Sequence, residues 1–263
     1  MRRGLAAAGR HLGMQTLSFN RLFPNMLTLL ALCAGLTAIR YGIAERWDRA
    51  VIALVAAAFL DGIDGRIARL LKVTSRFGQE LDSLADAISF GVAPAILMYL
   101  WSLQHGERFG WAIALVFAVC SVLRLARFNT MVGQDLPHWA HNYFTGVPTP
   151  SGAGLAILPL IMWLQTEHEA FRNPRLTGPF MVVVAVLMVS RVPTFSGKNM
   201  RVKPQLVLPL MILIGLVAAF LVTDPWATLS IIGLTYIAAI PFAVISFRRL
   251  KSAPVEPPST PGH

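Results

Sequence analysis

Charged residues are scarce in this 263-residue chain: they make up 14% of it, while 55% of the residues are hydrophobic and the mean hydropathy is +0.60. The length alone would allow one or two soluble domains. However, the apolar residues gather in runs of about 17–25 residues, the length that a bilayer-spanning helix requires. The composition therefore indicates an integral membrane protein, and we see no soluble domain between the runs.

Cysteine and acidic residues are also few. Cys33 and Cys120 both lie inside apolar segments, which argues against a disulfide framework. Only 13 acidic residues face 23 lysines and arginines, so the formal net charge is +10. Such a charge would suggest nucleic acid in a soluble protein, but no aromatic-plus-basic module is visible, and the basic residues cluster beside apolar segments as they do near anionic headgroups. We expect membrane lipid, and no nucleic acid, as a partner.

The apolar runs predict an all-α bundle of about eight transmembrane helices, which form one polytopic domain over residues 23–250. Pro24 is expected to open the first span, because proline suits the first turn of a helix. The expected spans are residues 24–43, 50–71, 80–101, 110–131, 150–166, 177–192, 205–223 and 226–247.

The two ends of the chain differ from the apolar middle. Residues 1–22 carry four arginines among spaced apolar residues, which predicts a basic interfacial helix; a frayed tail is the alternative. Arg10 and His11 interrupt the apolar core that a signal peptide would need. The Pro-rich residues 251–263 are expected to be disordered.

The basic residues also predict an orientation. With eight spans, 17 lysines and arginines lie at the ends that share a side with the N-terminus, and six lie on the opposite side. The positive-inside rule then places both termini in the cytoplasm, together with the polar turn at residues 72–76. A site near that turn would open toward the cytoplasm.

The stretch from Asp61 to Asp86 holds four of the seven aspartates between strongly apolar flanks. Carboxylates within membrane-length apolar runs are costly, so they usually mark an ion site, a proton path or catalysis. Asp61 and Asp64 are three residues apart, and Asp82 and Asp86 are four apart, so each pair projects from one face of a helix. If the polar turn folds the second helix back antiparallel, all four carboxylates converge.

Four converging carboxylates repel one another unless a cation lies among them. Ligation by oxygen alone selects a hard ion, such as Mg²⁺, Mn²⁺ or Ca²⁺, rather than zinc. Gly65 and Gly78 lack side chains that would hinder close helix approach or a bulky polar ligand. Arg69 lies roughly 12 Å along the helix from Asp61, where it could meet a phosphate.

These residues carry a resemblance to a known family. The pattern Asp61-x2-Asp64-Gly65-x2-Ala68-Arg69-x8-Gly78-x3-Asp82-x3-Asp86 is similar to the signature of the CDP-alcohol phosphotransferases at every fixed position. Chance would give eight fixed positions with a probability on the order of one in 10⁸. The alternative is that the four acids only hold helices together.

The resemblance implies a transferase that uses Mg²⁺ or Mn²⁺ and acts as a homodimer. It implies metal ligation by the aspartates and a general-base role for the last of them, Asp86. It further implies contacts with the CDP group at Gly65, Arg69, Ser75 and Gly78. The positions predicted as metal ligands are Asp61, Asp64, Asp82 and Asp86. Asn25 and Thr28 resemble further nucleotide-facing positions of the family, although local helix capping is an equal alternative.

Two downstream stretches narrow the resemblance. Residues 124–129, Arg-Leu-Ala-Arg-Phe-Asn, and residues 144–150, Phe-Thr-Gly-Val-Pro-Thr-Pro, are similar to the branch of the family that joins CDP-diacylglycerol to L-serine. A serine carboxylate requires an arginine fork, and Arg124 or Arg127, which share a helix face beside Asn129, could supply it. The alternative is that these arginines only neutralise headgroups at a cytoplasmic helix end.

Other functions remain open from the sequence alone. A sibling transferase would accept glycerol phosphate, inositol phosphate or choline; a phosphorylated acceptor would demand extra basic charge in the pocket. A cation-coupled transporter could use the aspartates as an ion path, but transport does not require Gly65, Ala68, Arg69 and Gly78 at fixed spacing. The resemblance to the serine branch and the orientation together predict a bacterial inner-membrane enzyme whose site faces the cytoplasm.

Overall fold

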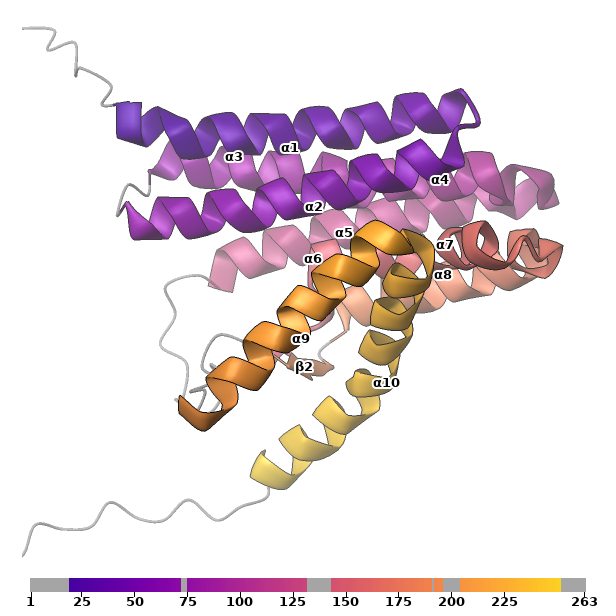
Figure 1. Ribbon diagram of the computed structural model, residues 1–263. Helices are drawn as coiled ribbons and strands as arrows, with labels where there is room; N and C mark the ends of the chain where they lie inside the picture. The colour runs from indigo at the N-terminus through magenta and orange to yellow at the C-terminus, as the bar shows by residue number, and fades with distance from the viewer. Residues whose placement is uncertain (1–18, 72–74, 132–142, 191, 196–203, 252–263) are drawn as a thin grey trace, which may run out of the picture.

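The computed structural model describes residues 19–71, 75–131, 143–190, 192–195 and 204–251. Most of the predicted interfacial segment 1–22 and nearly all of the tail 251–263 lie outside these residues. Within them the protein is α-helical, which confirms the predicted class (Figure 1). Among the described residues, five helical stretches are long and apolar enough to cross a membrane, and one of them is the composite stretch Arg76–Trp101. Each predicted span coincides with a helix or a run of helices, while the number of crossings stays a prediction.

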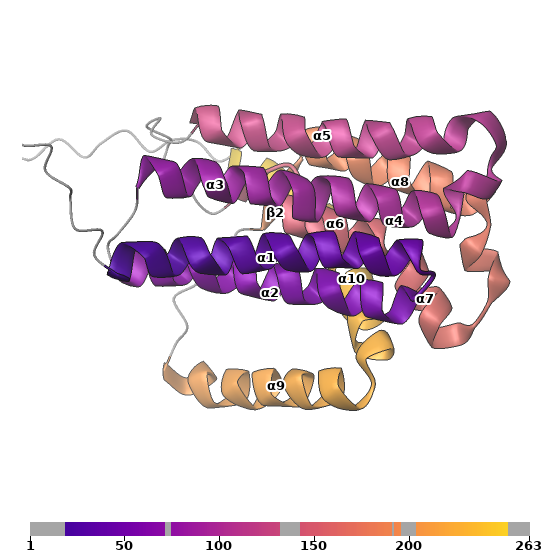
Figure 2. The same cartoon turned by 90° about the horizontal axis from the view of Figure 1, so that it is seen from above.

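The first two helices form an antiparallel pair, α1 (Phe19–Ile43) and α2 (Trp47–Leu70), which lie side by side in Figures 1 and 2. Small buried residues, including Ala38, Ala50 and Ala57, allow the two helices to approach closely. The first membrane-length apolar stretch begins at Phe23, next to Pro24, as the sequence predicted. The helix itself begins earlier: α1 starts at Phe19 and contains Pro24, so the expectation that Pro24 lies in its first turn was wrong. Just past the first turn, proline removes only one backbone hydrogen bond, so the helix continues through it.

The third predicted span is interrupted. It consists of α3 (Arg76–Asp86), the π-helical turn η1 (Ala87–Val92) and α4 (Ala93–Trp101). Ser75 caps α3 by accepting a hydrogen bond from the backbone N–H of Gly78, so the helix starts four residues before the predicted position 80. Pro94 has no N–H to donate to the preceding turn, which favours the change of helical pitch before it.

The next segments complete the bundle. The short helices η2 (Leu103–His105) and η3 (Glu107–Phe109) lead to α5 (Gly110–Met131), which packs along α8 (Pro174–Val189). The fifth predicted span divides into α6 (Thr149–Ala156) and α7 (Leu158–Thr166), because Pro159 at the second position of α7 restarts the helix. The turn η5 (Glu169–Arg172) connects α7 to α8.

A pair of three-residue strands, β1 (Tyr143–Thr145) and β2 (Pro193–Phe195), was not foreseen from the sequence. They pair antiparallel, with Phe144 opposite Thr194. This pair joins the segment before α6 to the segment after α8. It is too small to change the fold class.

The core is formed by α4, α5, α6, α7 and α8 together with the adjoining faces of α1 and α2; its large residues Trp101, Phe117, Leu160 and Met188 are fully or almost fully buried. Residues 205–220 of α9 (Pro204–Thr223) are all exposed, and this helix stands apart from the bundle in Figure 2. The last helix, α10 (Pro225–Lys251), packs against α7 and β2. The many exposed leucines, isoleucines and valines are the surface expected of a protein surrounded by lipid.

Candidate active site

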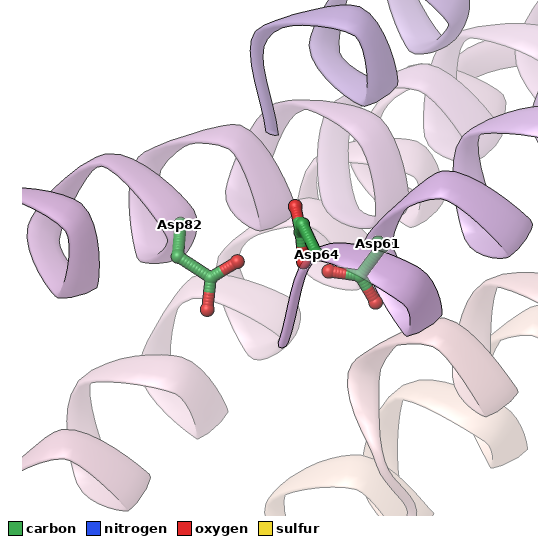
Figure 3. Close-up of side chains that lie close together, drawn as sticks. All are labelled: Asp61, Asp64 and Asp82. Atoms are coloured by element: carbon green, nitrogen blue, oxygen red, sulfur yellow. The ribbon is translucent and has the colours of Figure 1, made fainter. Parts of the chain in front are cut away.

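Three carboxylates meet between the second and third predicted spans. Asp61 and Asp64 project from α2, and Asp82 projects from α3 toward them (Figure 3). One oxygen of each lies within 4.8 Å of the others. Helices α2 and α3 both pack against α1, which therefore sets their separation. The spacing of three residues between Asp61 and Asp64 places both on one helix face, as the sequence predicted.

Asp64 is the most enclosed of the three, with 3% of its surface exposed. The hydroxyl of Thr28 in α1 donates a hydrogen bond of 2.8 Å to Oδ2 of Asp64. The same hydroxyl lies 3.1 Å from the backbone carbonyl of Pro24, one helical turn earlier. Thr28, predicted either to face a nucleotide or to cap locally, thus also orients a carboxylate of the neighbouring helix.

Asp86 stands beside the trio. Its carboxyl group lies next to that of Asp61, but the three carboxylates whose oxygens lie within 4.8 Å of one another are Asp61, Asp64 and Asp82. Asp86 ends α3, and the π-helical turn η1 follows immediately. π-Helical turns are frequent at functional sites because they change the direction in which neighbouring side chains project. Asp86 therefore has a setting different from that of the other aspartates.

The donor set fits a hard divalent cation. Three carboxylates, contributed by two helices in an apolar bundle, offer oxygen ligands only. Without a cation, their mutual repulsion in a site of low dielectric constant would be costly. The hydrogen bond from Thr28 to Asp64 is of the kind that orients ligands around a bound metal.

Two of the residues predicted to contact CDP are glycines, Gly65 in α2 and Gly78 in α3, and they differ in the space around them. A Cβ atom added at Gly65 would meet no atom within 4 Å, so the helix face beside Asp64 is open at this position. At Gly78, by contrast, a Cβ atom would lie 2.9 Å from Oδ1 of Asn25, so this glycine lets α3 approach α1 closely. The structure thus brings Asn25 and Gly78 together and leaves space at Gly65.

Two other predicted CDP contacts have local partners. Arg69 donates from Nε to the backbone carbonyl of Gly65, at 2.9 Å. Ser75 accepts the 3.0 Å bond from the N–H of Gly78 that caps α3. Both side chains are exposed near the end of the bundle where α2 ends and α3 begins.

The two arginines predicted for the acceptor carboxylate have different partners. Arg124 donates from Nη1 to Oγ1 of Thr149, at 2.6 Å, and its guanidinium lies over the ring of Phe128. Its Nε is buried and has no hydrogen-bond partner within the part of the chain that the structure describes. Arg124 also interacts electrostatically with Asp86, which places it near the trio.

Arg127 and Asn129 are engaged elsewhere. Arg127 donates from Nη1 to the backbone carbonyl of Val189, at 3.2 Å, at the last residue of α8. Asn129 donates from Nδ2 to the hydroxyl of Ser83, at 2.8 Å, and so links α5 to α3 next to Asp82. Of the three residues predicted to bind the acceptor, Arg124 is therefore the one whose Nε is left without a partner among the described residues and which lies near Asp86.

Sequence reasoning did not assign roles to Thr149, Ser83 and Tyr236. Thr149 and Ser83 lay in stretches that resembled the family, but hydroxyl groups are common and their partners come from distant helices. Tyr236 in α10 lies near Arg124, so the last helix reaches the neighbourhood of the site. Its apolar surroundings gave no sequence signal.

Comparisons with known proteins identify the family of the chain. A family model described as CDP-alcohol phosphatidyltransferase matches residues 21–192, and one described as CDP-alcohol phosphatidyltransferase 2 matches residues 205–241. A Mycobacterium tuberculosis protein named CDP-diacylglycerol–serine O-phosphatidyltransferase is 37% identical over 235 residues, which cover 89% of this chain and 82% of that protein. A Helicobacter pylori protein with the same name is 37% identical over 201 residues, covering 76% of this chain and 81% of the relative. The resemblance noted in the sequence is confirmed, and the chain belongs to the CDP-alcohol phosphatidyltransferase family.

Proposed function

We propose that this protein transfers the phosphatidyl group from CDP-diacylglycerol to the hydroxyl group of L-serine, giving phosphatidylserine and CMP. The observation that carries the proposal is the convergence of Asp61, Asp64 and Asp82, with Asp86 beside them and the cationic Arg124 nearby. The relatives from M. tuberculosis and H. pylori, whose names state this reaction, support serine as the acceptor.

Asp61, Asp64 and Asp82 would hold Mg²⁺ or Mn²⁺. When bound there, the ion supplies charge neutralisation at the diphosphate and stabilises the departing phosphate. Thr28 keeps the Asp64 carboxylate in place through its 2.8 Å hydrogen bond. The open face at Gly65 gives the CDP group access to the carboxylates, and the exposed Arg69 lies one turn away.

Asp86 is the general base of the proposed reaction. A serine hydroxyl has a pKa far above neutrality, so its proton must be removed as its oxygen attacks the phosphorus of the phosphatidyl group. The proton passes to the Asp86 carboxylate, the new oxygen–phosphorus bond forms, and the bond from that phosphorus to the CMP phosphate breaks. The position of Asp86, next to Asp61 and outside the group of three that would hold the ion, supports this role.

Arg124 binds the acceptor's carboxylate in this proposal. Arg124 is half-buried, and its enclosed Nε has no hydrogen-bond partner among the described residues; this favours an anionic ligand, because an unsatisfied donor in an apolar site is costly. Arginine and carboxylate can then pair through two parallel hydrogen bonds. Acceptors without a carboxylate, such as choline, would leave this donor unsatisfied.

We also propose that the site opens to the cytoplasm of a bacterial inner membrane, with both termini on that side. The 17-to-six distribution of basic residues supports this orientation. In Figure 2 the start of α1, the end of α2, the start of α3 and the end of α5 lie at one end of the bundle, as the predicted topology requires. We further propose a homodimer, which the family resemblance supports.

The test is CMP release by the purified protein with CDP-diacylglycerol and a panel of alcohols, with Mg²⁺ or Mn²⁺ present. Serine should support the fastest release, and EDTA should abolish it. Asp61→Asn and Asp82→Asn should nearly abolish turnover while the protein still folds. Asp48→Asn, which changes an exposed aspartate at the start of α2, is the matched control and should leave turnover unchanged. Preference for another alcohol, or full activity in EDTA, would overturn the proposal.

A further inference from the structure

The Gly-Val-Pro-Thr-Pro turn, which runs from Gly146 to Pro150, is fixed against the end of α8. Gly146 has a φ of +82°, and its N–H donates to the carbonyl of Val192 at 2.9 Å. A Cβ atom at Gly146 would lie 2.5 Å from the carbonyl oxygen of Met188, so glycine is required there for two independent reasons. The fully buried Val147 donates its N–H to the carbonyl of Leu187.

This turn determines where Thr149 lies. Pro148 precedes α6 with a φ of −56° and a ψ of 146°, and Thr149 is the first residue of the helix. Pro150 follows at the second helical position, where proline's fixed φ favours the helix. Two prolines and a tightly packed glycine therefore hold the fully buried Thr149 in one backbone position.

The Thr149 hydroxyl accepts the hydrogen bond from Nη1 of Arg124, at 2.6 Å. A guanidinium has five N–H donors in a planar fork, and Thr149 engages only one of its nitrogens. The edge formed by Nε and Nη2 is suited to a bidentate carboxylate, and no described residue is a hydrogen-bond partner of the buried Nε. Thr149 thus binds Nη1, which is not part of the Nε–Nη2 edge.

The pair also lies close to the chemistry. Helices α5, which carries Arg124, and α6, which begins with Thr149, both pack against the turn η1 that directly follows Asp86. A rigid contact between Thr149 and Arg124 would therefore fix the distance between the bound carboxylate and the general base. An acceptor held at a fixed distance from the base is already oriented for attack, which lowers the barrier to the reaction.

We infer that Thr149 is a positioning residue for acceptor selection: it holds Arg124 so that the Nε–Nη2 edge of the guanidinium receives the acceptor's carboxylate. The inference deepens the proposed function and rests on it, since it presumes an acceptor that carries a carboxylate. It assigns the Gly-Val-Pro-Thr-Pro turn the role of a platform for recognition of that acceptor.

The test compares Thr149→Val, which keeps the shape but removes the hydroxyl, with Thr149→Ser, which keeps the hydroxyl. Thr149→Val should raise the KM for serine by about tenfold or more, as expected for loss of a hydrogen bond to a charged group. The KM for CDP-diacylglycerol should change little, and Thr149→Ser should recover most of the serine affinity. Rates with ethanolamine, which lacks the carboxylate, should be equal in the wild type and the valine variant, so the preference for serine over ethanolamine falls.

Thr177→Val is the matched control. Thr177 is also a fully buried threonine near the start of a helix, but its hydroxyl contacts that of Ser102, and Ser102 in turn contacts the carbonyl of Arg172, outside the site. This variant should leave the serine KM unchanged. If Thr149→Val does not fold, as judged by its melting temperature in detergent, the smaller Thr149→Ala is measured in its place with the same expected result.

The possible failures are distinct. If the wild type releases no CMP with serine, the proposed function is wrong. If the wild type uses serine, Arg124→Lys raises the serine KM, and Thr149→Val does not, the function stands and the inference about Thr149 is wrong. An equal rise of both substrates' KM values in Thr149→Val would also overturn it, because that result indicates a general loss of structure.

Discussion

Oγ1 of Thr28 lies 2.8 Å from Oδ2 of Asp64, across 36 residues of sequence, and this hydrogen bond joins α1 to the carboxylate trio. The family signature lies wholly between Asp61 and Asp86, yet the most enclosed of its carboxylates is oriented from outside the signature. Outer groups of this kind fix the direction of a ligand's lone pairs and are a large part of metal affinity. The first helix is thus part of the site as well as of the scaffold.

Replacing Thr28 should therefore weaken metal use. Thr28→Val removes the hydrogen bond while keeping the side-chain shape, and the Mg²⁺ or Mn²⁺ concentration for half-maximal CMP release should rise about 10–100-fold. Thr28→Ser should restore it. Titration of activity against the divalent ion at saturating substrates gives the measurement.

The matched control for Thr28 lies on the same helix. Thr37 donates to the carbonyl of Cys33, one turn earlier, much as Thr28 bonds to Pro24, but no contact with the aspartates is found for it among the described residues. Thr37→Val should leave the metal requirement unchanged. Equal metal titrations for Thr28→Val and the wild type would remove Thr28 from the site.

The positions of the aspartates were the easiest part of the site to predict from the sequence. Their spacings of three and four residues encode a shared helix face directly, and carboxylates inside apolar runs are conspicuous. The helical class and most helix positions also followed from the apolar runs. What the sequence could not give was the partner across a helix interface, such as Thr28 for Asp64, because contacts between helices have no fixed spacing.

The arginines illustrate a second limit. A separation of three residues correctly placed Arg124 and Arg127 on neighbouring parts of one face, but their long side chains extend to different helices, α6 and α8. The change of pitch at η1 and the strands β1 and β2 were likewise missed. Both depend on packing against distant segments, which overrides local preference.

Gly65 should be required for the substrate and not for folding. A Cβ atom added at either Gly62 or Gly65 meets no atom within 4 Å, so both alanine variants should fold, with a gain of up to about 1 kcal/mol in helix stability. We expect Gly65→Ala to raise the KM for CDP-diacylglycerol, because its methyl group occupies space beside Asp64. Gly62→Ala changes one of the variable positions of the signature, between Asp61 and Asp64; it is the control and should retain the wild-type KM. If both variants keep the wild-type KM, the space at Gly65 is not the CDP site.

The predicted orientation can be tested with single cysteines at opposite ends of the bundle. Gln79 is exposed near the start of α3, and Gln104 is exposed in η2 at the other end. In a background with Cys33 and Cys120 replaced by alanine, Gln79→Cys should react with an impermeant thiol reagent only from the cytoplasmic face, and Gln104→Cys only from the opposite face. The reverse labelling in sealed vesicles of known orientation would overturn the topology and, with it, the cytoplasmic site.

Arg124 and Arg127 should differ in what their loss changes. Removing Arg124 leaves an acceptor carboxylate unpaired in a desolvated site, which should cost about 3–5 kcal/mol of serine binding in Arg124→Ala. Arg124→Lys should be milder, because it keeps the charge and loses only the fork.

Arg127 instead donates to the carbonyl of Val189, the last residue of α8. Arg127→Ala should therefore lower the free energy of unfolding by about 0.3–1 kcal/mol, the usual contribution of a cation at a helix C-terminus, and leave the serine KM near that of the wild type. Steady-state kinetics at saturating CDP-diacylglycerol and thermal melts separate the two effects. If Arg124→Ala keeps the wild-type serine KM, the acceptor pocket lies elsewhere; if it weakens only the binding of CDP-diacylglycerol, Arg124 belongs to the diphosphate site.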